Sequence, residues 1–313
     1  MSEPTKHFEV AGPADFINNR LAQDFLEHCA ARTSQALSEW LDRYAQPAPK
    51  LHEAMRYSLE SRGKRIRPAL VLASNRACGG AEEQALPAAC AIEMVHTFSL
   101  IHDDLPGMDN DDLRRGVPTN HKVFGEGMAI LAGDGLLSLA FELLSEEIRS
   151  AELAVALIGE LARATGPAGM IGGQAMDLEF DAASTTDQLG EINAVHEAKT
   201  AALIRCACRM GGLCGEADEQ ELAVLGRFGH VIGLAFQVGD DLLDVTGSHS
   251  EVGKRTGKDV DAGKPNYVHA TGVERAYQHQ AKLLGQAVAA LEGFGNSAEL
   301  LTDLGRMIVQ RRR

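Results

Sequence analysis

The sequence predicts an all-α fold, and three observations support this. Apolar residues recur at intervals of three and four along most of the chain, which places them on one face of a helix. Alternating runs of Val, Ile and Thr, which are typical of strands, are scarce. Glycine and proline lie mostly between the periodic segments. These segments are, in chain order, 85–101, 127–148, 152–164, 188–213, 219–244, 274–292 and 298–309.

Breaker residues and a capping signal mark where these helices begin and end. The stretches "AQPAPK" (45–50), "CGGAEE" (78–83) and "TGPAG" (165–169) separate periodic segments. Asp218 and Glu221 have the spacing of a capping box, so the helix over 219–244 is expected to start there. Gly169, Gly172 and Gly173 are interpreted as permitting a close helix contact or a kink rather than as binding phosphate.

One long connection interrupts the helical pattern. Residues 246–266, "TGSHSEVGKRTGKDVDAGKPN", are polar and rich in glycine. Loops of this length are usually functional or disordered, and both interpretations stay open. No shift in composition, charged linker or internal repeat divides the chain. We therefore expect one domain over residues 1–313.

Composition excludes several classes of function. The formal net charge of −14 and the pI near 5.2 argue against nucleic-acid binding through a basic surface. The polar N-terminus resembles neither a signal peptide nor a transit peptide. The most apolar stretch, 128–144, is broken by Asp134, so no membrane span is expected. The six cysteines include no CxxC pair, and Cys206 and Cys208 are expected to be buried thiols in a reducing compartment, the cytoplasm.

An unusual density of aspartates follows an apolar run in "LIHDDLPGMDNDDLRR" (100–115). Like charges this close repel one another and raise each other's pKa values unless a cation neutralises them. A metal site is therefore one interpretation, and a solvated acidic loop is the other. The aspartates of this stretch are Asp103, Asp104, Asp109, Asp111 and Asp112.

A second acidic group closes an apolar helix in "FQVGDDLLDV". Asp240 and Asp244 are four residues apart, so their carboxylates share one helix face about 6 Å from each other. Such a pair on an apolar helix needs a cation, unless the two are surface carboxylates at a helix end. Taken together, the two acidic groups offer only oxygen ligands, which suit Mg²⁺ that also binds substrate phosphates.

Cationic residues at separate places in the chain are candidates for holding such phosphates. Their number suggests two anionic groups on the substrates. They are Lys64, Arg65, Arg67, Arg114, Arg115, Lys199 and the Lys254, Arg255, Lys258 and Lys264 of the long connection.

With these motifs the chain resembles the trans-isoprenyl diphosphate synthases, and within that family most of all the bacterial farnesyl and geranylgeranyl diphosphate synthases. "DDLPGMD" (103–109) resembles the first aspartate-rich motif, and "DDLLD" (240–244) the second. The stretches "GKRIRP", "EMVHTFSLIHDD", "GGQAMDL", "KT", "FQ" and "GKRTGKD" occur in the family's order. The resemblance covers about residues 50–313 and implies the isoprenoid synthase fold, a bundle of about ten or more helices around a central apolar cavity.

The resemblance also implies roles for individual residues. Asp103 and Asp109 would bind two Mg²⁺ ions, and Asp240 with Asp244 a third, while Asp104 counts among the catalytic carboxylates of the first motif. The allylic diphosphate would be held by Arg114, Lys199, Thr200, Gln237 and Lys254. The diphosphate of isopentenyl diphosphate would be held by Lys64, Arg67, His96 and Arg115. Arg62 departs from the family, which often has glycine there.

The implied reaction is a head-to-tail condensation of isopentenyl diphosphate with an allylic diphosphate. Breaking the allylic C–O bond develops negative charge on the leaving diphosphate, and cations around it stabilise that charge. The resulting carbocation needs dry, apolar walls. The departing diphosphate takes the proton, so no side-chain base is required. His96 would then contact diphosphate, although a satisfied, partly buried histidine is the alternative.

Product length can be argued from a predicted helix over 85–104. Phe98 and Ser99 precede Asp103 by five and four residues, a rise of about 6 to 8 Å. In the resembling family a bulky aromatic residue at the position of Phe98, combined with the two-residue insertion in the first aspartate motif, goes with a farnesyl (C15) product, and a smaller residue there with C20. Geranylgeranyl (C20) and geranyl (C10) diphosphate remain alternatives, as does Phe98 being ordinary core.

Other classes are less well supported. A terpene cyclase would not need Lys64, Arg67 and Arg115, and a non-catalytic synthase subunit would be expected to have lost an aspartate motif. An HD phosphohydrolase would need more histidine ligands than "HDD" (102–104) supplies. Asp134 could be a further metal ligand, but a hydrogen-bonded aspartate within a helix is favoured. The family analogy suggests a homodimer.

Overall fold

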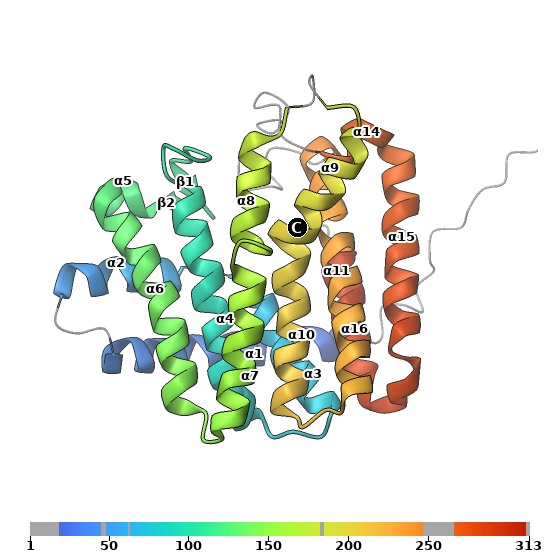
Figure 1. The fold of residues 1–313 in the computed structure, drawn as a ribbon, viewed down its shortest axis with the longest axis horizontal. Helices are drawn as coiled ribbons and strands as arrows, with labels where there is room; N and C mark the ends of the chain where they lie inside the picture. Colours follow the sequence, from blue (N-terminus) through green and yellow to red (C-terminus); the bar gives the residue numbers. More distant parts are fainter. Residues whose placement is uncertain (1–18, 45–47, 62, 182–184, 247–265, 311–313) are drawn as a thin grey trace, which may run out of the picture.

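The computed structural model describes residues 19–44, 48–61, 63–181, 185–246 and 266–310, and these form an almost entirely helical bundle (Figure 1). The prediction of an all-α fold with ten or more helices is confirmed. The elements up to the middle of the chain are α1 (Asn19–Tyr44), α2 (Pro49–Leu59), α3 (Ile66–Ala77), α4 (Glu82–Asp103), β1 (Leu113–Arg114), β2 (Val117–Pro118), α5 (Asn120–Phe124), α6 (Glu126–Glu147), α7 (Ala151–Thr165) and α8 (Met170–Glu179).

The second half continues the bundle and contains one irregular helix. Its elements are α9 (Gln188–Val195), the π-helix η2 (His196–Ala201), α10 (Ala202–Cys214), α11 (Glu219–Thr246), α14 (Tyr267–Thr271), α15 (Val273–Ala290), the 3₁₀ helix η3 (Glu292–Ala298) and α16 (Glu299–Val309). A single continuous helix was expected over 188–213, and the structure instead has a π-helical turn within it. The short antiparallel hairpin β1–β2 was also not expected from the periodicity.

Local chemistry explains several helix boundaries. The predicted capping box is confirmed: the Glu221 N–H donates to Asp218 Oδ1 at 2.8 Å, and the Asp218 N–H donates to Glu221 Oε2 at 2.9 Å. The Ser150 hydroxyl accepts from Leu153 N at 3.2 Å and caps α7. Pro49 opens α2, where its missing N–H leaves no hydrogen bond unmade.

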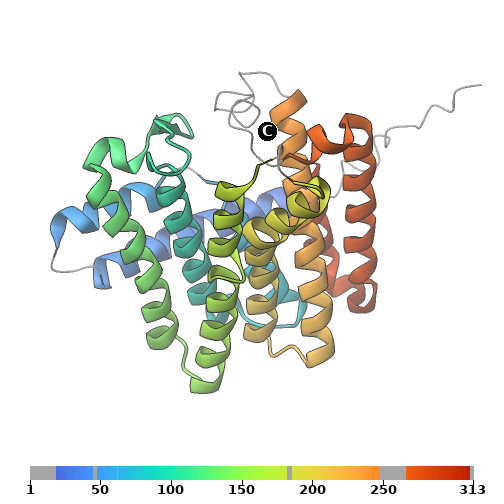
Figure 2. The ribbon, with the colours of Figure 1, turned by 45° about the horizontal axis from the view of Figure 1, so that its top comes forward.

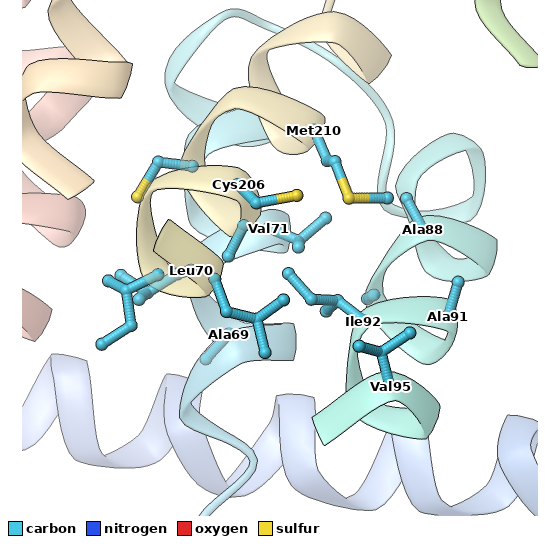
Figure 3. Packing of buried hydrophobic residues seen from close by; sticks show 14 of the residues in the cluster. Ala69, Leu70, Val71, Ala88, Ala91, Ile92, Val95, Cys206 and Met210 are labelled. Atoms are coloured by element: carbon cyan, nitrogen blue, oxygen red, sulfur yellow. The ribbon is translucent and has the colours of Figure 1, made fainter. Parts of the chain in front are cut away.

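The core is formed where α3, α4 and α10 pack against one another. Figure 3 shows Val71 of α3, Ile92 of α4 and Met210 of α10 meeting in one cluster, and all three are fully buried. Cys206 and Cys208 also lie in this interior, which confirms the prediction that they are buried. Because α4 is surrounded in this way, its C-terminal end, where the first aspartate motif begins, is held rigidly.

The long helices α4, α6 and α11 are each long and apolar enough to cross a membrane by length and composition alone. The expectation that no stretch meets this criterion is therefore wrong, because the single carboxylate of Asp134 does not offset the many leucines and alanines around it. Burial differs among the three: 83% of the apolar window in α4 is buried inside the fold, against 44% in α6 and in α11.

Candidate active site

The two aspartate motifs lie at the same end of the bundle. The chain direction brings the C-terminal ends of α4 and α11 to the upper end in Figure 1, together with the hairpin β1–β2, α8 and α9. Figure 2, in which this end is turned forward, shows the same grouping. Residues more than a hundred positions apart in the sequence are therefore presented on one face of the molecule.

The loop after α4 folds back so that the aspartates of the first motif come together. The Asp109 N–H donates to the Asp103 carbonyl at 2.8 Å, and the Asp111 N–H to the Asp104 carbonyl at 3.3 Å. Burial raises the pKa of Asp103 to about 6; the negative charges of Asp109 and Asp104 raise it further, while Lys199 and Arg114 lower it. A bound cation would relieve this repulsion.

Asp104 has a different role from its neighbour. It is 3% exposed and accepts hydrogen bonds from Arg114. Arg114 Nε lies 2.9 Å from Asp104 Oδ1 and 2.8 Å from Oδ2, and Arg114 Nη2 lies 2.6 Å from Oδ1. Such a fork-shaped contact between guanidinium and carboxylate is strong and directional. The pair joins strand β1 to the end of α4 and thereby sets the position of the next residue, Arg115.

The second motif likewise contains both partly exposed aspartates and a buried one. Asp240 and Asp244 are half-buried one turn apart near the end of α11, whereas Asp241 is 5% exposed. Asp241 Oδ2 accepts from the backbone N–H of Tyr267 at 2.6 Å, and Oδ1 accepts from Gln237 Nε2 at 3.2 Å. The middle aspartate of "DDLLD" therefore anchors the start of α14, and the outer two keep their partial exposure.

The π-helix η2 carries Lys199 and Thr200. Helix α8 lies directly on it, because Gly173 has no side chain: a Cβ there would be 2.2 Å from Lys199 N. This confirms the interpretation of Gly173 as a close-contact residue. Lys199 Nζ donates to Asp177 Oδ2 of α8 at 2.5 Å, and Thr200 Oγ1 donates to Gln237 Oε1 at 2.8 Å. Single π-helical turns are frequent at functional sites.

Asp177 and the π-helix are functional features that sequence reasoning missed. Asp177 belongs to "GGQAMDL", in which no role was expected for the aspartate. The adjacent glycines were the available signal, because a helix that closely approaches another needs them on the contact face.

A cationic cluster surrounds His96 on α4. Burial holds the pKa of His96 well below its usual value, and the nearby positive charges of Arg67, Arg115, Arg114 and Arg65 lower it further. The imidazole is therefore neutral at pH 7 and can donate one N–H to an anion. The cluster is well suited to binding a diphosphate.

The hairpin places Arg115 within this cluster. Arg115 has a left-handed φ of 55°, and Gly116 follows with φ of 82°, so the chain reverses between the two short strands. Gly63 lies against the guanidinium: a Cβ on Gly63 would be 2.5 Å from Arg115 Nη1. The neighbouring Lys64 is exposed and Arg67 is half-buried. Arg62 and Lys254, with the other cations of the long connection, lie outside the described residues.

Phe98 and Ser99 are buried on α4, 7% and 9% exposed. The Phe98 ring meets His102 edge-on, with ring centroids 4.8 Å apart and planes at 76°. His102 Nε2 in turn lies 3.1 Å from the Ile130 carbonyl of α6. Asp134 is an exposed residue of α6 whose Oδ1 lies 3.8 Å from His102 Nε2, and it joins no cluster of metal-ligand side chains among the described residues.

The donors suit Mg²⁺ only in combination with a substrate. Within the part of the chain that the structure describes, no three His, Cys, Asp or Glu side chains lie close enough to hold a metal by themselves. Each motif instead offers two partly exposed carboxylates. Mg²⁺ is usually held by one or two carboxylates, with waters and substrate phosphates completing its shell, so the residues fit that ion.

One pocket lies behind the Asp104–Arg114 pair. Its walls come from α2, α4 and the hairpin, and include Tyr57, Thr97, Ile101 and Pro118. Asp104 and Arg114 themselves line it, with Thr97 and Ile101 on the same face of α4 as Asp104. Asp103, Asp109, Asp240, Asp244 and His96 are not among its lining residues.

Comparisons with known proteins show what the chain is similar to. Residues 48–301 match the family model described as polyprenyl synthetase. The chain is 49% identical over 265 residues to geranylgeranyl pyrophosphate synthase 7 of Arabidopsis thaliana, which covers 84% of this chain and 76% of that one. It is also 49% identical over 248 residues to the farnesyl diphosphate synthase of Geobacillus stearothermophilus, covering 78% and 82%.

Solved structures give the same result. A crystal structure of an FPP/GFPP synthase from Zymomonas mobilis has a TM-score of 0.82 at 39% identity and covers 93% of this chain and 99% of that one. A geranyltransferase from Legionella pneumophila has a TM-score of 0.82 at 33% identity, with coverage of 94% and 98%.

Proposed function

Because the chain belongs to the polyprenyl synthetase family and is a trans-prenyltransferase of that family, we propose that it is a farnesyl diphosphate synthase. In this proposal it condenses isopentenyl diphosphate with dimethylallyl and then geranyl diphosphate. The observation that carries it is the pairing, at one end of the bundle, of two half-exposed carboxylate pairs with a cationic cluster around partly buried His96.

The outer aspartates of the two motifs are the proposed holders of magnesium. Asp103 and Asp109 form one pair, and Asp240 and Asp244 the other, with about three ions per active site by analogy with the family. When bound, Mg²⁺ neutralises charge on the diphosphate leaving group. The pKa of about 6 for Asp103 means that this carboxylate is ionised at neutral pH and gains from a nearby cation.

Residues of η2 and α11 are proposed to bind the allylic diphosphate. Lys199 offers an ammonium group that Asp177 already orients, so little conformational entropy is lost when an anion arrives. The Thr200 hydroxyl and the Gln237 amide are linked to each other, and Gln237 is held by Asp241. Arg114 adds positive charge from its fixed place beside Asp104, and Lys254 completes the set by family analogy.

The cluster around His96 is proposed to bind the diphosphate of isopentenyl diphosphate. Arg67 and Arg115 supply charge, Lys64 approaches from the exposed side, and neutral His96 donates a hydrogen bond. Burial lowers the pKa of Arg115, but an arginine remains charged at neutral pH even so. Two separate cationic groups match two diphosphate substrates, which favours a condensing enzyme over a terpene cyclase.

No side chain needs to act as a base in this reaction. The pKa of His96 is held low, and its surroundings are cationic, so it is a hydrogen-bond donor rather than a proton acceptor for a carbocation. In this proposal the buried apolar side chains of α4 would line the space for the hydrocarbon chain and exclude water from it. The proton is proposed to leave with the diphosphate.

Buried Phe98, five residues before Asp103 on α4, supports a C15 product. A ring held edge-on by His102 is a rigid floor for a growing chain. The relatives include both geranylgeranyl and farnesyl synthases at 49% identity, so the C20 product is the second candidate.

A homodimer is also proposed. Helix α6 is long and apolar but only 44% of its apolar window is buried, and Ile130 and Leu131 are 44% and 53% exposed. A second copy would cover this face. Light scattering of the wild type and of Leu131→Glu tests this: a monomeric wild type would contradict it.

Purified protein incubated with Mg²⁺, labelled isopentenyl diphosphate and each of dimethylallyl, geranyl and farnesyl diphosphate tests the proposed function. The dephosphorylated products are sized by chromatography. Farnesol as the end point is the expected result. Geranylgeraniol would keep the reaction and change the product, whereas no condensation with any starter would refute the proposal.

A further inference from the structure

Arg65 differs from the other basic residues of its motif. It lies between exposed Lys64 and half-buried Arg67, yet it is itself only 5% exposed. A buried arginine needs a partner, because an isolated charge is costly to remove from water. Its side chain therefore points into the fold, away from the position where a diphosphate would bind, and the proposed function gives it no task.

Glu93 of α4 is that partner. Arg65 Nη1 donates to Glu93 Oε1 at 2.8 Å, and the two side chains are each 4% exposed. Arg65 Nη2 also donates to the carbonyl of Leu59, the last residue of α2. One guanidinium thus joins the end of α2, the start of α3 and the middle of α4.

The backbone at Arg65 is in a conformation that needs support. Its φ is 49°, in the left-handed region that residues with a Cβ rarely adopt. Such strain persists only where surrounding contacts hold it, and it is concentrated at functional sites. The turn directs Arg65 inward, whereas Lys64 before it is exposed and Arg67 two residues after it is half-buried, and α3 begins at the next residue, Ile66.

Glu93 also lies beneath the rest of the cluster. It precedes His96 by three residues, so both share one face of α4. Its negative charge acts on Arg115, where it favours the charged guanidinium against the effects of burial and of Arg65. A single buried carboxylate therefore offsets the mutual repulsion of two cations, Arg65 and Arg115.

We infer that Arg65 and Glu93 form a positioning pair for the diphosphate-binding cluster, one that holds Lys64, Arg67 and Arg115 in the arrangement that binds isopentenyl diphosphate. This inference rests on the proposed function. Neither residue touches the substrate. The pair acts through the left-handed turn and through the charge beneath the cluster, and the alternative is an ion pair that only stabilises the fold.

The test is the Glu93→Gln variant, which keeps the shape of the side chain and removes its charge. We expect the KM for isopentenyl diphosphate to rise about tenfold or more, with the KM for geranyl diphosphate within about twofold of wild type. A folded variant with both KM values unchanged would overturn the inference. So would a parallel loss of all kinetic constants that follows the fraction of unfolded protein.

A double variant covers the case in which Glu93→Gln does not fold. Arg65→Met with Glu93→Leu replaces the buried ions by apolar groups of similar volume, a change that often leaves stability intact. The selective rise in the KM for isopentenyl diphosphate is expected here too, because the contacts that support the turn and the charge beneath the cluster are both lost. A wild-type KM in this variant would show that the pair is only structural.

Glu160→Gln is the matched control. Glu160 of α7 forms a fork-shaped pair with Arg209 of α10, with contacts of 2.9 Å to both Nε and Nη2, and it is not part of the cationic cluster. Its loss should lower thermal stability and leave both KM values unchanged; a selective rise like that of Glu93→Gln would overturn the inference. If the wild type condenses no substrates, the proposed function fails first, whatever the variants do.

Discussion

Replacing Gly173 by alanine would test how tightly α8 is seated on the π-helix. An added Cβ would lie 2.2 Å from Lys199 N, 2.5 Å from Lys199 Cα and 2.8 Å from the Ala198 carbonyl carbon. All three are backbone atoms, which cannot rotate aside. Ordinary contact begins near 3.5 Å, so α8 must move outward by roughly 3.5 − 2.2 = 1.3 Å.

The energetic and functional effects of this movement differ. Overpacking costs about 1 to 3 kcal/mol, and alanine regains about 1 kcal/mol of helix propensity over glycine, so we expect a net loss of about 1 to 2 kcal/mol. The catalytic effect is larger, because Asp177 moves with α8 and no longer orients Lys199 from 2.5 Å. A displacement of about 1 Å at such a group can reduce the rate about a hundredfold.

Thermal unfolding and steady-state kinetics together measure both effects. Gly173→Ala should lower kcat/KM for the allylic substrate far more than its small loss of Tm implies, with a lesser change in the KM for isopentenyl diphosphate. Gly127→Ala is the matched control, since this glycine of α6 has no atom within 4 Å of an added Cβ. Gly173→Ala with wild-type Tm and kinetics would refute the reasoning about the contact.

Further predictions concern the aspartates and the cavity floor. Asp103→Ala and Asp240→Ala should each lower turnover by orders of magnitude while the protein stays folded, and near-wild-type rates would reject the metal assignment. Asp104→Asn should instead lower the free energy of unfolding by about 3 kcal/mol or more, because it leaves the half-buried guanidinium of Arg114 without its counter-charge. An unchanged Tm would contradict this. Phe98→Ala should lengthen the product, as chromatography of the dephosphorylated alcohols would reveal, and an identical product profile would exclude Phe98 as the floor. Mg²⁺ affinity measured by calorimetry should weaken as the pH falls through about 6. Burial raises the pKa of Asp103 to about 6, so below that pH Asp103 is protonated and cannot ligate the ion. Equal affinities at pH 7.5 and 5.5 would argue against Asp103 as a ligand.

The local sequence carried enough information to predict the helices that bury a continuous apolar face. The segment 127–148 became α6 over Glu126–Glu147, and the segment 152–164 became α7 over Ala151–Thr165. The capping box at Asp218 located the start of α11 within one residue. These features depend on residues a few positions apart, and their physics is therefore visible in sequence windows.

The π-helix could not be predicted in this way. Residues 188–213 have an uninterrupted helical periodicity, and the extra residue per turn at His196–Ala201 is compatible with it. What holds that turn is contact with α8 through Gly173 and with α11 through Gln237. Both partners are distant in sequence, so the local periodicity of residues 188–213 cannot reveal these contacts.

The aspartate motifs illustrate the boundary between the two kinds of information. The sequence by itself determined that acidic pairs and cationic motifs are present, and in which order, which was sufficient to identify the family and its chemistry. Only the tertiary structure decided which carboxylates in each motif stay partly exposed and which one is buried. Asp104 accepts hydrogen bonds from Arg114, and Asp241 accepts them from Gln237 and from the backbone N–H of Tyr267. Burial and pairing depend on what packs against each side chain, and neighbouring aspartates of identical chemistry acquire different roles only when the chain has folded around them.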